Sequence, residues 1–296
     1  MKTLPITEKR KIWFAISTVI VLIGLVSMLT RGFNLGIDFT GGSLLELKFQ
    51  KAVTLEEIRE VLRAHGLENS VIQLAGLTGQ AVENSTVLIR TAALDDVARK
   101  RVTDDLGAKI GAFDILRIEN VGAVLGGEIT RQAAVAIVLS WLLMIAYITW
   151  RFEFKFAVAS IIALLQDVIA VLTFFSLFQI EIDATFVAAL LTIIGYSIND
   201  TIVIFDRIRE NMRTFRRTDS LTALADKSIR QTLARSIYTV LTVLFVTAAL
   251  YFFGGDTTRN FSLALIVGLA FGSYTSIFCA GSFWVELNRR RLKSAN

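Results

Sequence analysis

Three ionisable residues lie in or at the ends of long apolar stretches of the sequence. Asp167 is in the middle of one apolar run, Asp200 is in the next, and Arg235 begins the one after that. A charge at the centre of a membrane helix costs about 2.5–3.5 kcal/mol, so such residues usually face partners, water or a transport path. The first hypothesis is therefore a proton or ion relay. The alternative is a structural ion pair that holds a helix bundle together.

The elements that carry these residues are predicted to be transmembrane helices. The chain has 296 residues, of which 54% are hydrophobic and only one is proline. Its long apolar runs are Ile12–Leu29, Ala133–Trp150, Phe156–Phe178, Thr185–Phe205, Ser236–Phe253 and Phe261–Val285. At 1.5 Å per residue, each run can cross a hydrocarbon core about 30 Å thick. We expect six spans, the first of them an uncleaved anchor.

The distribution of basic residues predicts the orientation of these spans. The net charge is +5, and the bases gather before span one, between spans two and three, between spans four and five, and after span six. The alternate short loops are poor in bases, so the positive-inside rule places both termini in the cytoplasm and the large loop outside it. This arrangement explains the charge without nucleic-acid binding.

The resulting domain organisation has five parts. They are a cytoplasmic N-terminus at 1–11, a first span at 12–29, an extracytoplasmic domain at 30–132, a five-helix transmembrane domain at 133–285 with a cytoplasmic connection at 206–235, and a cytoplasmic basic tail at 286–296.

The large loop has the pattern of a folded α+β domain. Strands are predicted at Ser43–Phe49, Ser70–Leu74, Thr86–Thr91 and Asp114–Ile118, with helices at Leu55–Ala64 and Leu94–Ile110. Thr54, followed three residues later by Glu57, indicates a capping box, and Gly76–Asn84 is expected to form a turn region. The order βαββαβ is typical of a ferredoxin-like unit. The loop sequence shows no paired catalytic carboxylates, metal-ligand cluster or activated nucleophile, so we interpret the domain as a binding module for extended polypeptide.

Span four carries a polar stripe. Thr192, Tyr196 and Asn199 recur at helical spacing and lead to Asp200. Asp200 and Arg235 are predicted to lie at similar depths in adjacent antiparallel helices, where they could pair. Because burial favours the neutral acid and a nearby arginine favours the carboxylate, such a site could change protonation when the helices move apart.

Three motifs resemble the SecD/SecF family of protein-export membrane subunits, which belongs to the resistance-nodulation-division superfamily. They are NLGIDFTGGS at 34–43, VGAVLGGEITRQA at 121–133 and, most specifically, GYSINDTIVIFDRIREN at 195–211. The resemblance covers nearly the whole chain, including the order of one span, one large external domain and five further spans. It implies a multi-pass protein of the bacterial cytoplasmic membrane.

The resemblance also implies function and partners. Such a subunit pairs with SecD, a homologous six-span protein, associates with the SecYEG channel, and uses the proton-motive force to complete the export of unfolded polypeptides. The acid of the SxND motif and an arginine opening the next span serve proton coupling, and these fall on Asp200 and Arg235. No cofactor, bound metal or enzymatic activity is implied.

Two departures from the family pattern and one loop motif leave alternatives open. Ala123 replaces a usual proline, and Gln166 replaces a frequent histidine before Asp167. Asp167 is therefore either part of the proton path or a buried acid hydrogen-bonded to neighbouring helices. The segment with Gly36, Asp38, Gly41 and Gly42 is expected to be a turn into the first strand that also orients the domain.

Three functions compete on this evidence. The leading one is a non-enzymatic, proton-coupled subunit of protein export. The second is half of a proton-driven small-solute or lipid exporter of the same superfamily, which the small single external domain disfavours. The third is a passive scaffold, which differs from the first only in whether Asp200 titrates.

Overall fold

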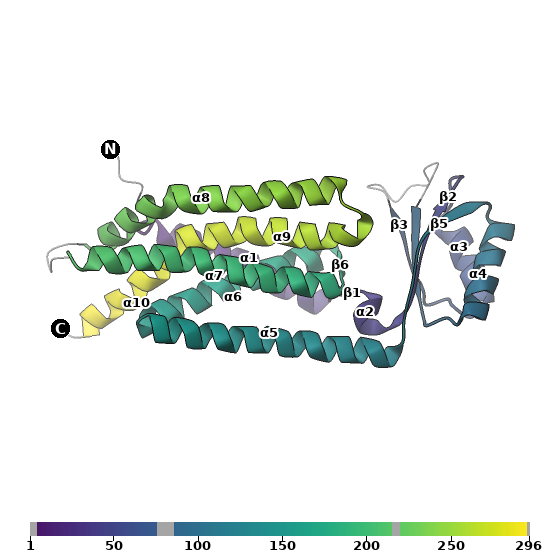
Figure 1. Cartoon of the computed structure of the whole chain (residues 1–296), viewed down its shortest axis with the longest axis horizontal. Helices are drawn as coiled ribbons and strands as arrows, with labels where there is room; N and C mark the ends of the chain where they lie inside the picture. Colours follow the sequence, from purple (N-terminus) through teal and green to yellow (C-terminus); the bar gives the residue numbers. More distant parts are fainter. Residues whose placement is uncertain (1–4, 76–85, 215–219, 295–296) are drawn as a thin grey trace. The chain divides into compact units, whose positions relative to one another are not determined.

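The computed structural model describes residues 5–75, 86–214 and 220–294. The chain separates into two compact units, one formed by 1–34 with 135–296 and the other by 35–134. Within the described residues, six helices are long and apolar enough to cross a membrane, which confirms the predicted six spans. The first unit is the helix bundle of Figure 1, and the second is a small α+β domain.

The bundle consists of long helices joined by short connections. They are α1 (Arg10–Thr30), α5 (Ala123–Arg151), α6 (Phe154–Phe178), α7 (Ala184–Met212), α8 (Leu221–Phe253) and α9 (Asp256–Tyr274), the last continuing through the π-helix η1 (Thr275–Ala280) into α10 (Gly281–Ser294). Two-residue strands, β1 (Asn34–Leu35) and β6 (Glu181–Ile182), lie at helix ends. The Asn34 side chain donates a hydrogen bond of 2.8 Å to the Gln179 carbonyl.

Several helices extend beyond the apolar runs that predicted them. Helix α5 begins at Ala123 rather than near residue 133, α7 continues to Met212, and α8 begins at Leu221. The added helical turns contain charged and polar residues, so the apolar run is shorter than the helix that contains it. Ala123 is the first residue of α5, a position where proline is common because its N–H has no helical acceptor. The replacement by alanine therefore leaves the helix start intact.

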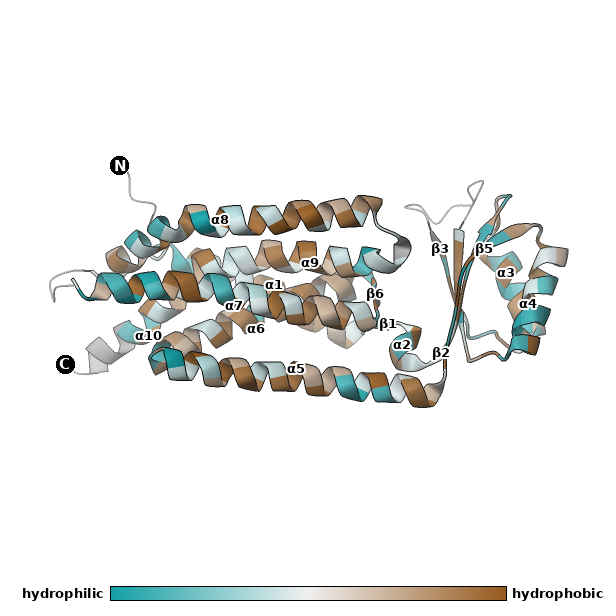
Figure 2. Cartoon of the chain, in the orientation of Figure 1, coloured by the Kyte–Doolittle hydropathy of each residue, from teal (hydrophilic) through white to brown (hydrophobic). Residues whose placement is uncertain are grey.

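The helices differ in how much of their surface is buried. Helix α1 packs against α6, and α7 packs against both α8 and α9. In α5, only 6% of the most apolar 18-residue stretch is buried, compared with 50% in α7. Figure 2 shows that much of α5 and α8 is hydrophobic, and many of their large apolar side chains are exposed. An exposed apolar face of this kind is suited to lipid or to another membrane helix.

The second unit is a four-stranded antiparallel sheet with helices on one face. Its elements are β2 (Gly42–Phe49), α3 (Leu55–Ala64), β3 (Val71–Ala75), β4 (Thr86–Thr91), α4 (Asp96–Lys109) and β5 (Phe113–Val121). The strand order is β3-β4-β2-β5, and Ser43 lies opposite both Thr91 and Asn120. This arrangement confirms the predicted ferredoxin-like α+β organisation.

Alternating residues of the central strands form the core of this unit. Leu45, Leu47 and Phe49 of β2 are fully buried together with apolar residues of α3 and α4. In Figure 1 both helices lie on the same side of the sheet. Two-residue periodicity therefore predicted the buried face correctly. The turn region expected at Gly76–Asn84 lies outside the described residues.

Side-chain caps determine where the two domain helices begin. Thr54 and Glu57 form the predicted capping box at α3, with Glu57 accepting from the Thr54 backbone N–H at 2.9 Å. Helix α4 begins at Asp96 rather than at Leu94, because the Asp95 carboxylate accepts from the Ala98 N–H at 2.7 Å. An N-cap satisfies a backbone donor that the helix cannot.

The glycine motif is more than a simple turn. A short helix, α2 (Ile37–Thr40), precedes Gly41 and Gly42, which have φ of 69° and 128°. A Cβ on Gly42 would lie 2.4 Å from the Thr91 carbonyl oxygen, and one on Gly41 would lie 3.0 Å from the Cα of Ala123. Both positive φ and lack of space therefore require glycine here. The motif packs the start of α5 closely against α2.

Candidate functional site

Asp167 lies on α6 and is completely buried. Its carboxylate accepts hydrogen bonds from the hydroxyls of Ser197 on α7 and Thr275 at the start of η1. One acid therefore joins three helical elements at the middle of the bundle. Each of its two carboxylate oxygens therefore has a hydroxyl donor.

Asp200 lies on α7 and is 8% exposed. One carboxylate oxygen, Oδ1, accepts a hydrogen bond from the Ser236 hydroxyl of α8. The other oxygen, Oδ2, is buried and has no hydrogen-bond partner among the described residues. A buried oxygen without a donor is unfavourable for a carboxylate, and it is also the atom that can accept a proton.

A small cavity lies beside Asp200 between α7, α8 and α9. Its volume is about 10 Å³, and its lining includes Ser197, Asp200, Gly272 and Ser273. One water molecule needs about 10–15 Å³ and two to four polar partners. The cavity is at the lower limit of that size, and its exposed wall is apolar, so it lacks the polar partners that a bound water needs.

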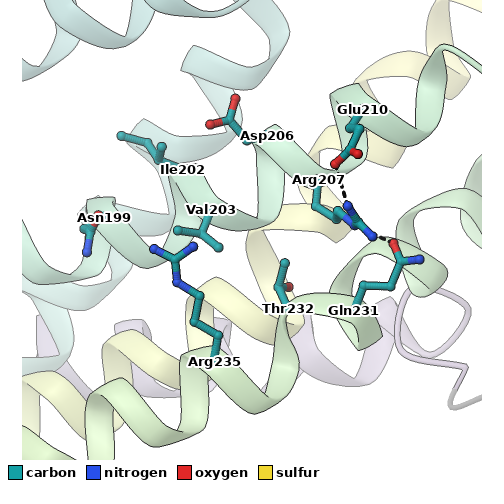
Figure 3. A pocket seen from close by; sticks show the side chains of 9 residues that line it. All are labelled: Asn199, Ile202, Val203, Asp206, Arg207, Glu210, Gln231, Thr232 and Arg235. Carbon is teal, nitrogen blue, oxygen red and sulfur yellow. Dashed lines mark hydrogen bonds and ion pairs between the residues drawn. The ribbon is translucent and has the colours of Figure 1, made fainter.

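The sequence left open an ion pair between Arg235 and Asp200. Among the described residues, no ion pair joins the two, and Ser236 takes the position next to the carboxylate. Arg235 is exposed and lines an open pocket of about 620 Å³ between α7 and α8. Figure 3 shows its guanidinium extending from α8 towards α7. The sequence predicted the similar depth of the two residues, but adjacent positions on a helix point in different directions.

The polar stripe predicted on α7 divides into two groups. Thr192 and Asn199 are exposed, and Asn199 lines the same pocket as Arg235. The Tyr196 hydroxyl donates to the Thr239 carbonyl of α8 at 2.7 Å. Asp200 instead points into the bundle. Thr192 and Asn199 therefore lie on the exposed face of α7, whereas Asp200 lies at the edge of its buried face.

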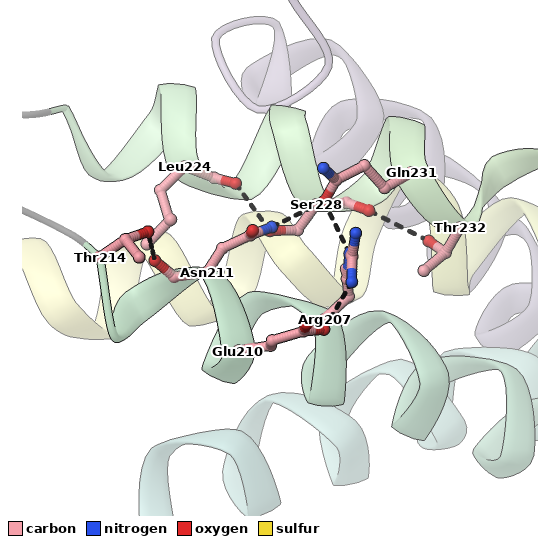
Figure 4. A network of polar contacts seen from close by, with 8 residues as sticks. All are labelled: Arg207, Glu210, Asn211, Thr214, Leu224, Ser228, Gln231 and Thr232. Carbon is pink, nitrogen blue, oxygen red and sulfur yellow. Dashed lines mark hydrogen bonds and ion pairs between the residues drawn. The ribbon is translucent and has the colours of Figure 1, made fainter.

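A polar network joins the ends of α7 and α8. The Arg207 side chain donates to Gln231 at 2.7 Å and to Glu210 at 2.5 Å, and Asn211 donates to Gln231 and Ser228, each at 2.8 Å. Figure 4 shows these contacts between the two helices. Most of the connection predicted at 206–235 therefore belongs to the ends of α7 and α8, which are hydrogen-bonded to each other. Residues 215–219 lie outside the described part of the chain.

Small residues on α9 allow close packing against α7. A Cβ on Gly268 would lie 2.3 Å from Ile193, so that position has no space for a side chain. A Cβ on Gly272 would lie 3.4 Å from the Ser197 Cβ, which is ordinary van der Waals contact. Gly268 therefore lets α9 approach α7 closely. The π-helix that follows it places Thr275 against Asp167, and such segments are frequent at functional sites.

Several residues of this site were not predicted from the sequence. Ser197, Ser236 and Thr275 supply the hydroxyl donors to the two acids. Each of these donors lies on a different element from the acid that it contacts, so spacing along the sequence carries no signal for them. A further buried acid, Asp226 of α8, accepts from the Thr7 backbone N–H at 2.8 Å and attaches the N-terminal segment to the bundle. The glycine motif belongs to the other compact unit.

Comparison with known proteins places this site in a family context. Residues 102–290 match the family model described as protein export membrane protein SecD/SecF, C-terminal, and residues 26–53 match the SecD/SecF GG motif. The chain belongs to the SecD/SecF protein-export family. The GG-motif match contains the Gly41–Gly42 turn, and the larger match contains both acids and Arg235.

Individual SecD/SecF relatives agree with this assignment. The chain is 52% identical over 293 residues to protein translocase subunit SecF of Acidaminococcus fermentans, covering 99% of this chain and 100% of the relative. It is 37% identical to SecDF of Bacillus subtilis, covering 97% of this chain and 38% of that protein. The crystal structure of SecDF from Thermus thermophilus superposes with a TM-score of 0.86 at 34% identity, covering 96% of this chain and 38% of that one. The chain therefore spans less than half of the SecDF proteins.

Proposed function

We propose that this chain is an accessory subunit of the Sec protein-export translocase. Together with SecD, it uses the proton-motive force to complete the translocation of unfolded polypeptides across the bacterial cytoplasmic membrane. The observation that carries this proposal is Asp200, a buried carboxylate with one oxygen held by Ser236 and one without a donor, in a chain of the SecD/SecF family.

Asp200 and Arg235 are the proposed proton-coupling residues. A proton arriving at Asp200 removes its negative charge and weakens the attraction of the nearby positive charge of Arg235. It also weakens the charge-assisted hydrogen bond from Ser236, which joins α7 to α8. Changing the protonation state therefore changes the balance of forces between two helices. This change can drive a larger motion only if α7 and α8 have two alternative arrangements in which Asp200 binds a proton with different affinity.

The orientation and partners follow from charge placement and from the relatives. Bases before α1 and after the last span support cytoplasmic termini and an extracytoplasmic α+β domain. A SecDF relative more than twice the length of this chain supports SecD as the missing half. SecYEG and an unfolded polypeptide are the further proposed partners, the polypeptide held by the sheet of the α+β domain.

The decisive experiment measures late-stage translocation into vesicles with and without a proton gradient. Asp200→Asn keeps the shape of the side chain and removes titration, so stimulation by the gradient should be lost while membrane insertion and assembly with SecD continue. Arg235→Ala should have a similar effect because the neighbouring charge is gone. Asp167→Asn should be less damaging if its role is structural.

A matched control is available in the α+β domain. Asp104 is an exposed acid of α4, so Asp104→Asn removes one carboxylate without disturbing the bundle and should keep full stimulation. Normal stimulation in the Asp200→Asn protein would instead favour a passive scaffold.

A further inference from the structure

We propose that a groove between α1 and α6 binds one anionic phospholipid, with an acyl chain in the groove and the headgroup phosphate on Arg31. The groove shares no residue with the surroundings of Asp200 and Arg235. The inference therefore does not depend on the proposed proton coupling.

The groove is an open hollow with apolar walls. Its volume is about 440 Å³, and its walls include Leu22, Ile23 and Val26 of α1 and Leu177 near the end of α6. Each of these four side chains is at least 37% exposed. A concave surface of exposed apolar side chains on a membrane span is suited to a hydrocarbon chain.

One end of the groove carries a positive charge. Arg31 directly follows α1, is exposed, and is the one charged residue among the described residues that line the groove. Its Nη1 donates a hydrogen bond of 3.1 Å to the Leu177 carbonyl, which holds the guanidinium beside the groove. A guanidinium has five N–H donors in a planar fork that matches phosphate oxygens. Arg31 can therefore hold the Leu177 carbonyl and a phosphate at the same time.

The length of the groove favours a lipid over a transmembrane helix of a partner. From Leu22 to Arg31 the chain rises about 14 Å, at 1.5 Å per residue. This is roughly half of a hydrocarbon core about 30 Å thick, so the groove spans one leaflet, whereas a membrane-crossing helix needs about 20 residues of contact length. The distribution of bases predicts that this leaflet is the outer one.

The walls of the groove are held together by the protein itself. The hydroxyls of Ser27 and Ser176 are hydrogen-bonded at 2.9 Å, and the Ser176 hydroxyl donates to the Gly32 carbonyl at 2.8 Å. A Cβ on Gly24 would lie 1.9 Å from Thr173 Oγ1, so the two helices approach closely there. Because α1 and α6 are already joined, a lipid can bind without the cost of ordering the site.

The charge on Arg31 also predicts which headgroup is preferred. Phosphatidylglycerol has a net negative charge, whereas the phosphate of phosphatidylcholine is offset by a quaternary ammonium. A single guanidinium beside the headgroup therefore favours phosphatidylglycerol. The same interaction should weaken at high salt, because Arg31 is exposed.

Two substitutions test the two halves of the site. Arg31→Gln removes the charge but keeps a polar side chain, and Val26→Trp fills the groove but leaves Arg31 in place. Arg259→Gln is the control for charge, because Arg259 is an exposed base on the same predicted side of the membrane and does not line the groove. Val19→Trp is the control for bulk, because Val19 is an exposed residue of α1 outside the groove.

The measurement is native mass spectrometry of the full chain with its SecD partner, released from mild detergent and titrated with phosphatidylglycerol or phosphatidylcholine. The unchanged protein should retain one phosphatidylglycerol in preference to phosphatidylcholine. Arg31→Gln should weaken phosphatidylglycerol binding about tenfold, as expected for the loss of a hydrogen bond to a charged group, and should abolish the preference. Val26→Trp should weaken the binding of both lipids, and the two controls should bind as the unchanged protein does.

The alternatives give different results. Normal phosphatidylglycerol binding in either Arg31→Gln or Val26→Trp, or an equal loss in the matched control, would mean that only non-specific surface lipid is present and would overturn the proposal. Binding to the chain alone that is lost in the presence of SecD would mean that a partner helix occupies the groove, and this also overturns it. Selective loss in Arg31→Gln and Val26→Trp, with normal controls, supports the lipid site.

Discussion

At the scale of single residues, hydroxyl groups distinguish the two membrane acids. Asp167 has a donor for each carboxylate oxygen, Ser197 and Thr275, and no exposed surface. Asp200 has one donor, Ser236, and a second buried oxygen with no hydrogen-bond partner among the described residues. The two acids can therefore have different roles, because an acid with two donors is held in one position and an acid with one donor retains a site for a proton.

Thr275→Val should destabilise the bundle by about 1–3 kcal/mol, because it keeps the shape of the side chain but leaves a buried carboxylate oxygen without its donor. Thermal unfolding in detergent should show a lower melting temperature. Thr242→Val is the control: Thr242 is exposed, and its hydroxyl bonds only to the Thr239 carbonyl of its own helix. Its effect should stay within about 0.5 kcal/mol. Equal melting temperatures for both variants would contradict the role of Thr275.

A pH effect is expected at Glu57. Hydrogen bonds from the Thr54 backbone N–H and hydroxyl, each 2.9 Å, lower the pKa of the Glu57 carboxyl in the folded domain. The cap therefore stabilises α3 fully above the pKa of an unfolded glutamate, about 4.3, and this contribution is lost as pH falls through the lower folded pKa. Amide-exchange protection of α3 should decrease over that range. Glu57→Gln keeps a hydrogen-bond acceptor but cannot titrate in this range. In this variant, the amide protection of α3 should not decrease as the pH falls.

At the scale of elements, sequence periodicity predicted the α+β domain well. The strand predicted at Thr86–Thr91 and the helix predicted at Leu55–Ala64 have the observed bounds. Alternating apolar residues and a capping box are local signals, and here local preference and tertiary packing agree. Helix ends in the bundle were less predictable. Hydropathy measures contact with lipid rather than backbone hydrogen bonding, so α5 begins ten residues earlier than its apolar run.

The site itself was predictable only in part. The acids and Arg235 were visible as charges in apolar surroundings, but their partners come from other helices. Pairing of Ser236 with Asp200, and of Thr275 with Asp167, depends on helix rotation and on the π-helix. Serine and threonine are ordinary in membrane helices, so their residue type gave no distinguishing signal. The possible pairing of Asp200 with Arg235 is not observed among the described residues, because Ser236 rather than Arg235 contacts the carboxylate.

The glycine motif gives a prediction at this scale. Gly42→Ala should destabilise the α+β domain by about 2–4 kcal/mol, because φ is 128° and the new Cβ would lie 2.4 Å from the Thr91 carbonyl oxygen. Gly66→Ala is the matched control, with φ of 72° and nothing within 4 Å. It should cost only the left-handed backbone penalty, about 1–2 kcal/mol. The melting temperatures of the two full-length variants test this prediction. An equal decrease in both would show that the contact with the Thr91 carbonyl oxygen does not matter.

At the scale of the whole molecule, the two compact units have different sources of stability. The α+β domain has its own apolar core of strand and helix residues. The bundle has a mixed core in which small residues and hydroxyls allow helices to approach closely, whereas α5 has little buried surface. A membrane helix with so few contacts to its own chain is stabilised by lipid or by a partner helix. This is consistent with a chain that forms less than half of the related SecDF proteins.

The orientation of the chain in the membrane gives the last prediction. Bases lie at the helix ends on one side of the bundle, and the positive-inside rule therefore predicts that the connection between α7 and α8 faces the cytoplasm. Ser220 is exposed at the start of α8, so Ser220→Cys should not react with a membrane-impermeant thiol reagent added outside intact cells. Asp104→Cys, at an exposed position in the α+β domain, should react. The native Cys279 is buried and should give little background. Labelling at residue 220 but not at residue 104 would reverse the predicted orientation, and it would place the open pocket lined by Arg235 near the outer side of the membrane.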